Sequence, residues 1–247
     1  MEKIKVIKSE DVFGQMLWAY YKEEKGFEVF ERNDGYIYVD SPKVYFSEFK
    51  DWTLHQKLAM KFVKGRVLDV GCGVGRHSLY LQKKGFDVLG IDASPLAIKI
   101  CQLRGVRKAL VMPIEKIDFK PNSFTTFLMM GNNFSLFGSF KKARKLLKRF
   151  DKMTTESAVI IAETIDPYKK DNPKSQKYYE FNRARGRMSG QLRVRIRFEN
   201  YVSKWFDWLK VSKREMKEIL NGTNWQVKEF IDSEDLQYVA IIEKVSA

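Results

Sequence analysis

Residues 67 to 92 read VLDVGCGVGRHSLYLQKKGFDVLGID, and this stretch decides the fold. The run from 66 to 70 is apolar and β-branched and breaks into Gly71, Gly73 and Gly75, which predicts a strand and then a turn that a ligand can approach closely. A short helix is expected from about 75 to 84, and a second buried strand ends at Asp92. The unit is therefore strand, helix, parallel strand, with ligands expected at the carboxyl ends of the strands.

The spacing of the glycines distinguishes between two nucleotide cofactors. The dinucleotide fingerprint G-x-G-x-x-G would require glycine at position 76, where this chain has Arg76. Asp69 precedes the first glycine, and its carboxylate would repel a pyrophosphate but suits the positive charges of S-adenosylmethionine. Asp92 can accept two hydrogen bonds from ribose hydroxyls in either case. The charge pattern therefore favours S-adenosylmethionine over NAD.

This pattern, Asp69-x-Gly71-x-Gly73-x-Gly75 followed by Asp92, resembles motif I and the next acidic position of the class I S-adenosylmethionine-dependent methyltransferases. Ser94-Pro95 resembles the start of the family's next helix, and 111 to 119 resembles its third strand and adenine loop. The fourth strand is expected at 124 to 130, where Thr125 replaces an acid that many members carry. By this resemblance the cofactor-binding residues are Asp69, Gly71, Gly73, Gly75, Asp92, Ala93, Ile114, Glu115, Gly131 and Asn132.

The resemblance implies an α/β fold with a Rossmann-like, doubly wound, seven-stranded sheet whose last strand is antiparallel. We expect residues 1–59 to form an N-terminal cap and residues 60–247 to form the methyltransferase core. The cap reads as a helix at 10–25, a hairpin at 27–30 and 36–39, and a helix at 47–63. Within the core, residues 166–211 are predicted to be an inserted substrate lid. It reads as a helix at 172–188 and two strands at 192–199 and 201–211.

Four aromatic residues of the cap are candidates to line the pocket, by resemblance to small-molecule methyltransferases in which such an extension covers the cofactor. They are Tyr45, Phe46, Phe49 and Trp52. The alternative is that these side chains only pack against the sheet, as aromatic residues commonly do.

Positive charge is concentrated in two blocks, and the formal net charge of the chain is +14. One block is the predicted helix at 141–152, and the other is the run of arginines between 183 and 197. Clustered Lys and Arg can mark RNA binding, but they also suit a solvated face or the ion networks of a thermophilic protein. Arg193, Arg195 and Arg197 share one face of a strand, so they either address an anionic substrate or form the wet face of a hairpin.

The reaction that the resemblance implies is an in-line displacement at the methyl carbon of the cofactor. No catalytic residue can be assigned, and the candidates are Asn133, Tyr168 and His77. The run at 131–134 is not the Asn-Pro-Pro-aromatic signature of enzymes that methylate amino groups of DNA and RNA bases, which counts against that route.

Several classes of protein are disfavoured by the remaining sequence. The amino terminus lacks the apolar core of a signal peptide and no apolar stretch approaches about 20 residues, so a cytoplasmic protein without a membrane span is expected. Cys72 and Cys101 do not suggest a disulfide framework, and no Cys/His cluster predicts a metal. We therefore expect an S-adenosylmethionine-dependent methyltransferase acting on a small-molecule acceptor, because the cap and the insertion suggest an enclosed pocket. The alternatives are a tRNA or rRNA methyltransferase, a non-catalytic nucleotide-binding module, or an NAD-dependent dehydrogenase.

Overall fold

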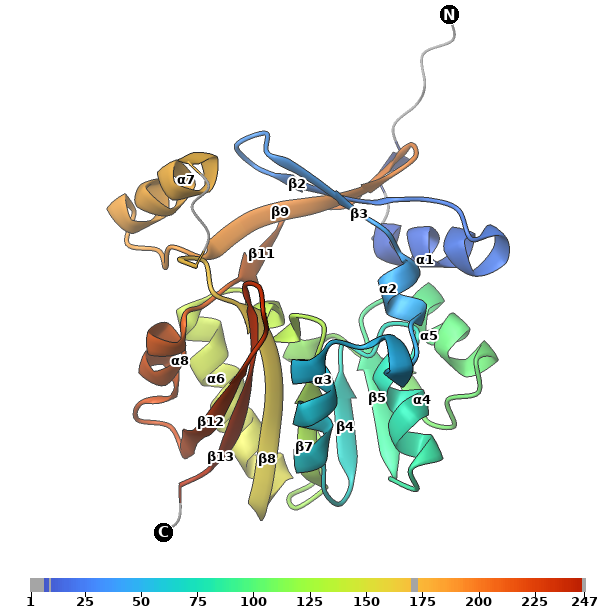
Figure 1. Cartoon of the computed structure of the whole chain (residues 1–247), viewed down its shortest axis with the longest axis vertical. Coiled ribbons are helices and arrows are strands. Elements are labelled where there is room, and N and C mark those ends of the chain that lie inside the picture. Colours follow the sequence, from blue (N-terminus) through green and yellow to red (C-terminus); the bar gives the residue numbers. More distant parts are fainter. Residues whose placement is uncertain (1–6, 9, 170–172, 246–247) are drawn as a thin grey trace, which may run out of the picture.

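The computed structural model describes residues 7–8, 10–169 and 173–245. Its larger sheet, here the core sheet, has seven strands in the order β12-β13-β8-β7-β4-β5-β6 (Figure 1). The strands are β4 (Val67–Val70), β5 (Val88–Asp92), β6 (Ala109–Val111), β7 (Phe124–Met129), β8 (Thr154–Ile165), β12 (Trp225–Asp232) and β13 (Gln237–Lys244).

The directions of the core strands confirm the predicted topology. β4 pairs in parallel with β5 and β7, and the parallel pairing continues to β6 on one side and to β8 on the other. The last strand, β13, is antiparallel to both of its neighbours, β8 and β12. All four residues of β4 are buried, as expected for a central parallel strand covered on both faces.

Helices cover both faces of the core sheet. On one face α3 (Leu54–Ala59) and α4 (Arg76–Lys83) pack with Val67 and Val88, and on the other α6 (Phe140–Met153) and α8 (Lys213–Leu220) pack with Leu68 and Val70. α5 (Pro95–Leu103) follows β5. Short 3-10 helices are η1 (Phe49–Asp51), η2 (Met60–Phe62), η3 (Ile114–Lys116) and η4 (Asn133–Phe137).

A second sheet combines the N-terminal hairpin with the insertion. It has the order β1-β10-β9-β2-β3, with β11 also paired to β9, and β2 is antiparallel to β9. This second sheet lies across the end of the core at which β8 leads into the insertion (Figure 1). Its strands are β1 (Ile7–Lys8), β2 (Glu28–Arg32), β3 (Ile37–Asp40), β9 (Gln191–Phe198), β10 (Tyr201–Val202) and β11 (Phe206–Leu209). The helices α1 (Val12–Glu23), α2 (Lys43–Phe46) and α7 (Pro173–Ala184) belong to the same segments.

Two predicted elements are each divided in the structure. The helix expected at 47–63 is divided into η1, α3 and η2, because the backbone is extended at Trp52 and Thr53. Trp52 is buried there against His77 and Tyr80, which holds the break in place. The strand expected at 201–211 is divided into β10 and β11, since the chain turns at Ser203, whose hydroxyl accepts a hydrogen bond from the Ile196 amide and donates one to the Lys204 carbonyl.

The helix predicted at 172–188 is shorter in the structure. α7 ends at Ala184, where Gly186 follows with a positive φ of 68°. A glycine in this conformation commonly ends a helix. The first residue of the prediction, Asn172, lies outside the described residues.

Candidate functional site

The turn after β4 is built by three glycines with positive φ, at 73° for Gly71, 53° for Gly73 and 81° for Gly75. A Cβ atom on Gly71 would lie 2.6 Å from Nδ2 of Asn133, and one on Gly75 would lie 2.6 Å from Cγ2 of Val106. A Cβ atom on Gly73 would meet nothing within 4 Å. The outer glycines are therefore required for packing, while the backbone of Gly73 faces open space that a ligand can use.

Asp92 fixes the position of this turn from the end of β5. Its Oδ2 accepts a hydrogen bond from the Gly73 amide at 2.9 Å, and its Oδ1 accepts one from the Ser94 amide at 2.9 Å. Burial raises the pKa of the Asp92 carboxyl, and these two hydrogen bonds oppose the rise. A carboxylate has about four acceptor positions, so Asp92 keeps capacity to bind the two hydroxyls of a ribose beside the open face of Gly73.

Asp69 is buried beneath the turn and contacts α4. Its Oδ2 accepts a hydrogen bond from Oγ of Ser78 at 2.6 Å, and burial raises its pKa to about 6. This contact ties the end of β4 to the helix that follows it. A direct contact between Asp69 and a cofactor stays a prediction.

The remaining predicted cofactor residues follow β5, β6 and β7. Ala93 is exposed directly after Asp92, while Ile114 is buried and Glu115 exposed in η3. Gly131 and Asn132 follow β7, and both have a positive φ. Oδ1 of Asn132 is buried, and none of the described residues reaches it with a hydrogen bond. Such an orphaned acceptor suits a ligand that donates a hydrogen bond at this edge.

The three candidate catalytic residues lie in different environments. Asn133 donates from Nδ2 to the carbonyls of Val70 and Gly71, at 2.9 and 2.8 Å, so it supports the glycine turn. His77 is buried against Trp52, and burial holds the pKa of its imidazole well below the usual value. Tyr168 is 44% exposed and donates from its hydroxyl to Oε1 of Glu215 in α8. The structure brings Asn133 to the predicted site and directs Tyr168 toward α8.

A buried polar cluster beside Gly131 escaped the sequence analysis. Oε1 of Glu163 in β8 contacts Nε2 of His55 at 2.8 Å and accepts a hydrogen bond from Nε2 of Gln56 at 2.8 Å. Its Oε2 accepts from the Gly131 amide at 2.6 Å. Burial raises the pKa of Glu163, but the hydrogen bonds outweigh this effect and hold the pKa below its usual value. The available signal was a single acid inside the apolar strand sequence IIAETI.

The N-terminal segment is tied directly to the glycine turn. Arg76 donates to the carbonyl of Val44 at 3.1 Å, and Arg104 donates to the carbonyls of Val74 at 2.7 Å and Phe46 at 3.3 Å. These bonds hold α2 against the turn. Tyr45 and Phe46 pack there with Val74, and their role in lining the pocket stays a prediction. Phe49 instead stacks on Tyr80 of α4, and Trp52 is buried, so these two aromatics pack against the core.

Each of the three arginines of β9 is paired with a carboxylate. Arg195 makes two hydrogen bonds to Glu31, at 2.9 and 2.7 Å, and Arg197 also pairs with Glu31. Arg193 pairs with Asp207 at 3.4 Å. The alternation therefore forms the wet face of a sheet.

On α6, five lysines are exposed, whereas Arg144 and Arg149 donate to backbone carbonyls. The exposed lysines are Lys141, Lys142, Lys145, Lys148 and Lys152.

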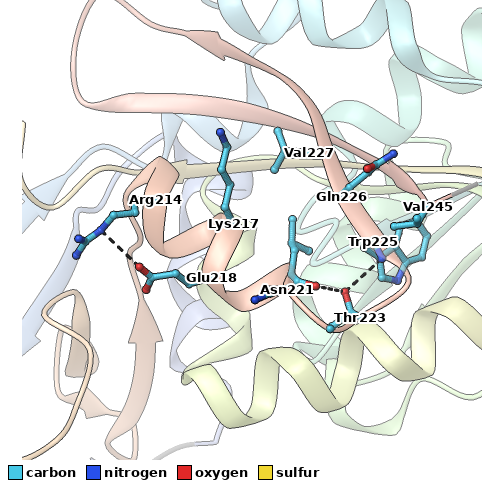
Figure 2. Close-up of a pocket in the computed structure, with 11 residues that line it drawn as sticks. Arg214, Lys217, Glu218, Asn221, Thr223, Trp225, Gln226, Val227 and Val245 are labelled. Atoms are coloured by element: carbon cyan, nitrogen blue, oxygen red, sulfur yellow. Dashed lines mark hydrogen bonds and ion pairs between the residues drawn. The ribbon is translucent and has the colours of Figure 1, made fainter.

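A surface hollow elsewhere in the molecule does not coincide with the predicted site. It lies between α8 and β12 and is lined by residues that include Arg214, Lys217 and Trp225 (Figure 2). None of the predicted cofactor residues borders it.

The described part of the chain offers neither a metal site nor a membrane-spanning helix. It holds no group of three His, Cys, Asp or Glu side chains arranged to bind a metal ion. Every helix in the described ranges is too short or too polar to span a bilayer.

Comparisons with known proteins agree with this geometry. A protein-family profile described as a methyltransferase domain matches residues 67–156. A ubiquinone biosynthesis O-methyltransferase from Bordetella avium is 37% identical over 67 residues, or 25% of this chain and 28% of that protein. A tRNA (uracil(54)-C(5))-methyltransferase from Pyrococcus horikoshii is 34% identical over 74 residues, or 29% of this chain and 18% of that protein. The chain thus spans less than a third of the length of either curated relative.

A solved structure extends the likeness to the whole fold. A methyltransferase from Bacteroides fragilis, in complex with S-adenosyl-L-homocysteine, aligns with a TM-score of 0.80 at 22% identity and covers 96% of both chains. The second sheet is therefore part of the shared architecture. Residues 67–156 thus match a methyltransferase domain, and the chain as a whole has the fold of an S-adenosylmethionine-dependent methyltransferase.

Proposed function

We propose that the protein binds S-adenosylmethionine at the glycine turn and transfers its methyl group to a small-molecule acceptor. The observation that carries the proposal is the open face of Gly73 beside the Asp92 carboxylate. A glycine backbone without a side chain, next to a carboxylate that can accept two hydrogen bonds from a ribose, fits a nucleoside. The buried carboxyl group of Asp69, just before the first glycine, favours a cationic cofactor over one with a diphosphate.

In this proposal the residues of the core hold the cofactor by its parts. Asp92 binds the ribose, Ile114 and Glu115 flank the adenine, and Gly131 and Asn132 face the methyl group. The cofactor supplies a methyl group that is already activated for displacement. The protein's contribution is to align the acceptor atom with the methyl carbon and to exclude water, which removes much of the entropic barrier. The bonds from Asn133 to the turn and from Gly131 to Glu163 hold this edge in one geometry.

A small-molecule acceptor is favoured by the way the site is covered. Residues 1–59 and the insertion at 166–211 act as the cap and lid of the core at 60–247, and they share one sheet. Arg76 and Arg104 hold α2 against the glycine turn, which limits access for a folded polynucleotide. RNA methylation remains the second candidate because α6 presents five exposed lysines.

The proposed location is the cytoplasm. Cys72 and Cys101 are both free thiols, which suits a reducing compartment.

The cofactor assignment is tested by isothermal titration calorimetry with S-adenosylhomocysteine, S-adenosylmethionine and NAD. We expect the first two to bind and NAD not to bind. The substitution Asp92→Ala should weaken S-adenosylhomocysteine binding by about 1 to 3 kcal/mol, because hydrogen bonds to a charged group are lost. Because Asp92 also supports the turn, the folding of the variant is verified by thermal unfolding.

A matched control is Asp87→Ala, which removes an exposed acid just before the same strand. It should leave the affinity for the cofactor unchanged. Binding of NAD without binding of S-adenosylhomocysteine would overturn the proposal. Radiolabelled methyl transfer to bulk tRNA, with no transfer to a metabolite mixture, would replace the small molecule by RNA.

A further inference from the structure

The second sheet has one apolar face, here the inner face, that is directed toward the rest of the protein. Strand registers place Phe30 opposite Ile196, Phe206 opposite Val194 and Trp208 opposite Leu192, so these side chains share that face. The opposite face carries the arginines of β9 with Glu31 and Asp207. α1 packs against one part of the inner face and α7 against another.

Lys210 extends the inner face by one further residue. Its amide donates to the carbonyl of Gly190 at 2.9 Å, which continues the β9–β11 ladder past Leu209. Because side chains alternate along a strand, Lys210 lies on the side of Phe206 and Trp208. These two rings lie 6.2 Å apart between centroids, and Phe30 lies 6.4 Å from Trp208. The side chain of Lys210 therefore shares the inner face with these aromatic rings.

The charge on Lys210 has no counter-ion within the described ranges. No described residue forms an ion pair or hydrogen bond with its ammonium group, and the nearby charge that acts on it is the like charge of Arg32. Burial and Arg32 lower the pKa of Lys210 to about 8. Arg32, by contrast, is neutralised by two 2.7 Å hydrogen bonds to Asp34 and lies over the ring of Tyr178. A partly buried cation without a partner is unfavourable unless an anion from outside completes it.

This ammonium group belongs to a strand that borders the proposed methyl-transfer edge. β11 packs on η4, and a Cβ atom on Gly138 would lie 3.2 Å from the carbonyl oxygen of Asp207. The first residue of η4 is Asn133, which binds the carbonyls of Val70 and Gly71 at the glycine turn. The contact with Gly138 is made by Asp207, on the opposite face of β11. The inner face itself reaches the glycine turn through Phe30 and Phe206, which belong to the same apolar cluster as Val74.

We propose that Lys210 binds a carboxylate of the methyl acceptor, whose apolar part lies against Phe30, Phe206 and Trp208. This inference rests on the proposed function and names its substrate class as a small aromatic or aliphatic carboxylic acid. One unpaired cation matches one negative charge, which fits a carboxylate better than a phosphate dianion. The surrounding rings supply apolar contact area, and binding excludes water around the ion pair.

The test measures binding of paired probes to the protein saturated with S-adenosylhomocysteine. The probes are benzoate, phenylacetate and indole-3-acetate, each compared by calorimetry with its neutral amide. We expect at least one carboxylate to bind at least about tenfold more tightly than its amide. Lys210→Met should abolish this preference, and Lys210→Arg should retain it because the charge is kept.

Lys204→Met is the matched control, since Lys204 lies just before β11, is 82% exposed and pairs with Glu10. It should keep the preference for the carboxylate. The inference is overturned if no carboxylate is preferred to its amide, or if the preference survives Lys210→Met. It is also overturned if inorganic phosphate binds in a Lys210-dependent manner as tightly as the carboxylates. If the unmodified protein does not bind S-adenosylhomocysteine, that result would instead contradict the proposed function.

Discussion

Glu28 places a carboxyl group among the apolar side chains of the inner face. It lies two residues before Phe30 in β2, on the same face of the strand, and is 3% exposed. Its Oε2 accepts a hydrogen bond from the Tyr45 hydroxyl at 2.8 Å, whereas no described residue hydrogen-bonds to its Oε1. Burial raises the pKa of Glu28 to about 7 from an ordinary value of 4.5. The folded protein therefore holds a proton at Glu28 that the unfolded chain releases at lower pH.

Because the pKa of Glu28 is higher in the folded protein, the free energy of unfolding should fall as the pH rises. The contribution of protonated Glu28 to the free energy of unfolding is fully present below about pH 4.5 and is lost as the pH rises through about 7. The loss amounts to up to about 3 kcal/mol. Glu28→Gln keeps an acceptor for Tyr45 but cannot ionise. We expect the variant to have a higher free energy of unfolding than the unmodified protein at pH 8 and a similar one near pH 4.5, as measured by urea unfolding.

The control for this experiment is Glu23→Gln, at an exposed surface ion pair of α1. It should leave the pH dependence of unfolding unaltered. Equal stability gains of Glu28→Gln at both pH values would show that ionisation of Glu28 is not the cause.

Individual residues were predictable where the relevant partners lie close in the sequence. Gly71, Gly73 and Gly75 were identified because a strand that breaks into spaced glycines has a local physical meaning, and the structure gives all three a positive φ. His55 and Glu163 were not connected, because their contact joins residues 108 positions apart. The importance of Lys210 likewise depends on Arg32 and on the sheet face that it shares with Phe206 and Trp208, which its own sequence neighbourhood does not reveal.

Among the elements, those of the core were located well and those of the cap less well. The central strands β4, β5 and β7 lie in apolar segments bounded by turn residues, which indicates short buried strands. The prediction of one continuous helix at 47–63 was wrong, because burial of Trp52 in an extended conformation outweighs a nearly continuous helical pattern. The pairing of β2 with β9 could not be predicted, since the sequence of neither strand identifies the strand it pairs with.

The contact between α3 and β8 provides a prediction at this scale. His55→Ala removes one of the hydrogen-bond partners of the buried Glu163 carboxylate, which keeps Gln56 and Gly131. We expect the free energy of unfolding to fall by about 2 to 3 kcal/mol, since a hydrogen bond to a buried charge is lost. Urea denaturation measures this. Leu54→Ala, at a 68% exposed position of the same helix, should change stability little, and an equal effect of both substitutions would contradict the argument.

At the scale of the whole molecule, the positive charge is unevenly compensated. The arginines of β9 are paired with Glu31 and Asp207, whereas the lysines of α6 remain exposed. The prediction of a thermophilic origin, which also drew on this charge, stays untested. Non-specific attraction of polyanions should therefore depend on α6 and weaken as salt increases.

The triple substitution Lys141→Glu, Lys145→Glu and Lys148→Glu tests this directly. We expect retention on a heparin column to fall sharply. The affinity for S-adenosylhomocysteine should stay the same, because these exposed lysines form no hydrogen bond or ion pair with any predicted cofactor residue in the described part of the chain. The corresponding control reverses two charges in β9, Arg193→Glu and Arg197→Glu, and should reduce retention less. Loss of methyl transfer to RNA in the triple variant, where such transfer is detected, would favour the RNA alternative.

The union of β2 with β9 also bears on how the chain is made. A ribosome releases residues 28–32 well before the strand that completes their hydrogen bonds, at residues 194–197, because more than 150 residues separate the two strands. Until then the hairpin has an unsatisfied edge and an uncovered apolar side, both of which invite association with other chains. We therefore expect nascent chains stalled before β9 to depend more on chaperones than chains that already include β9.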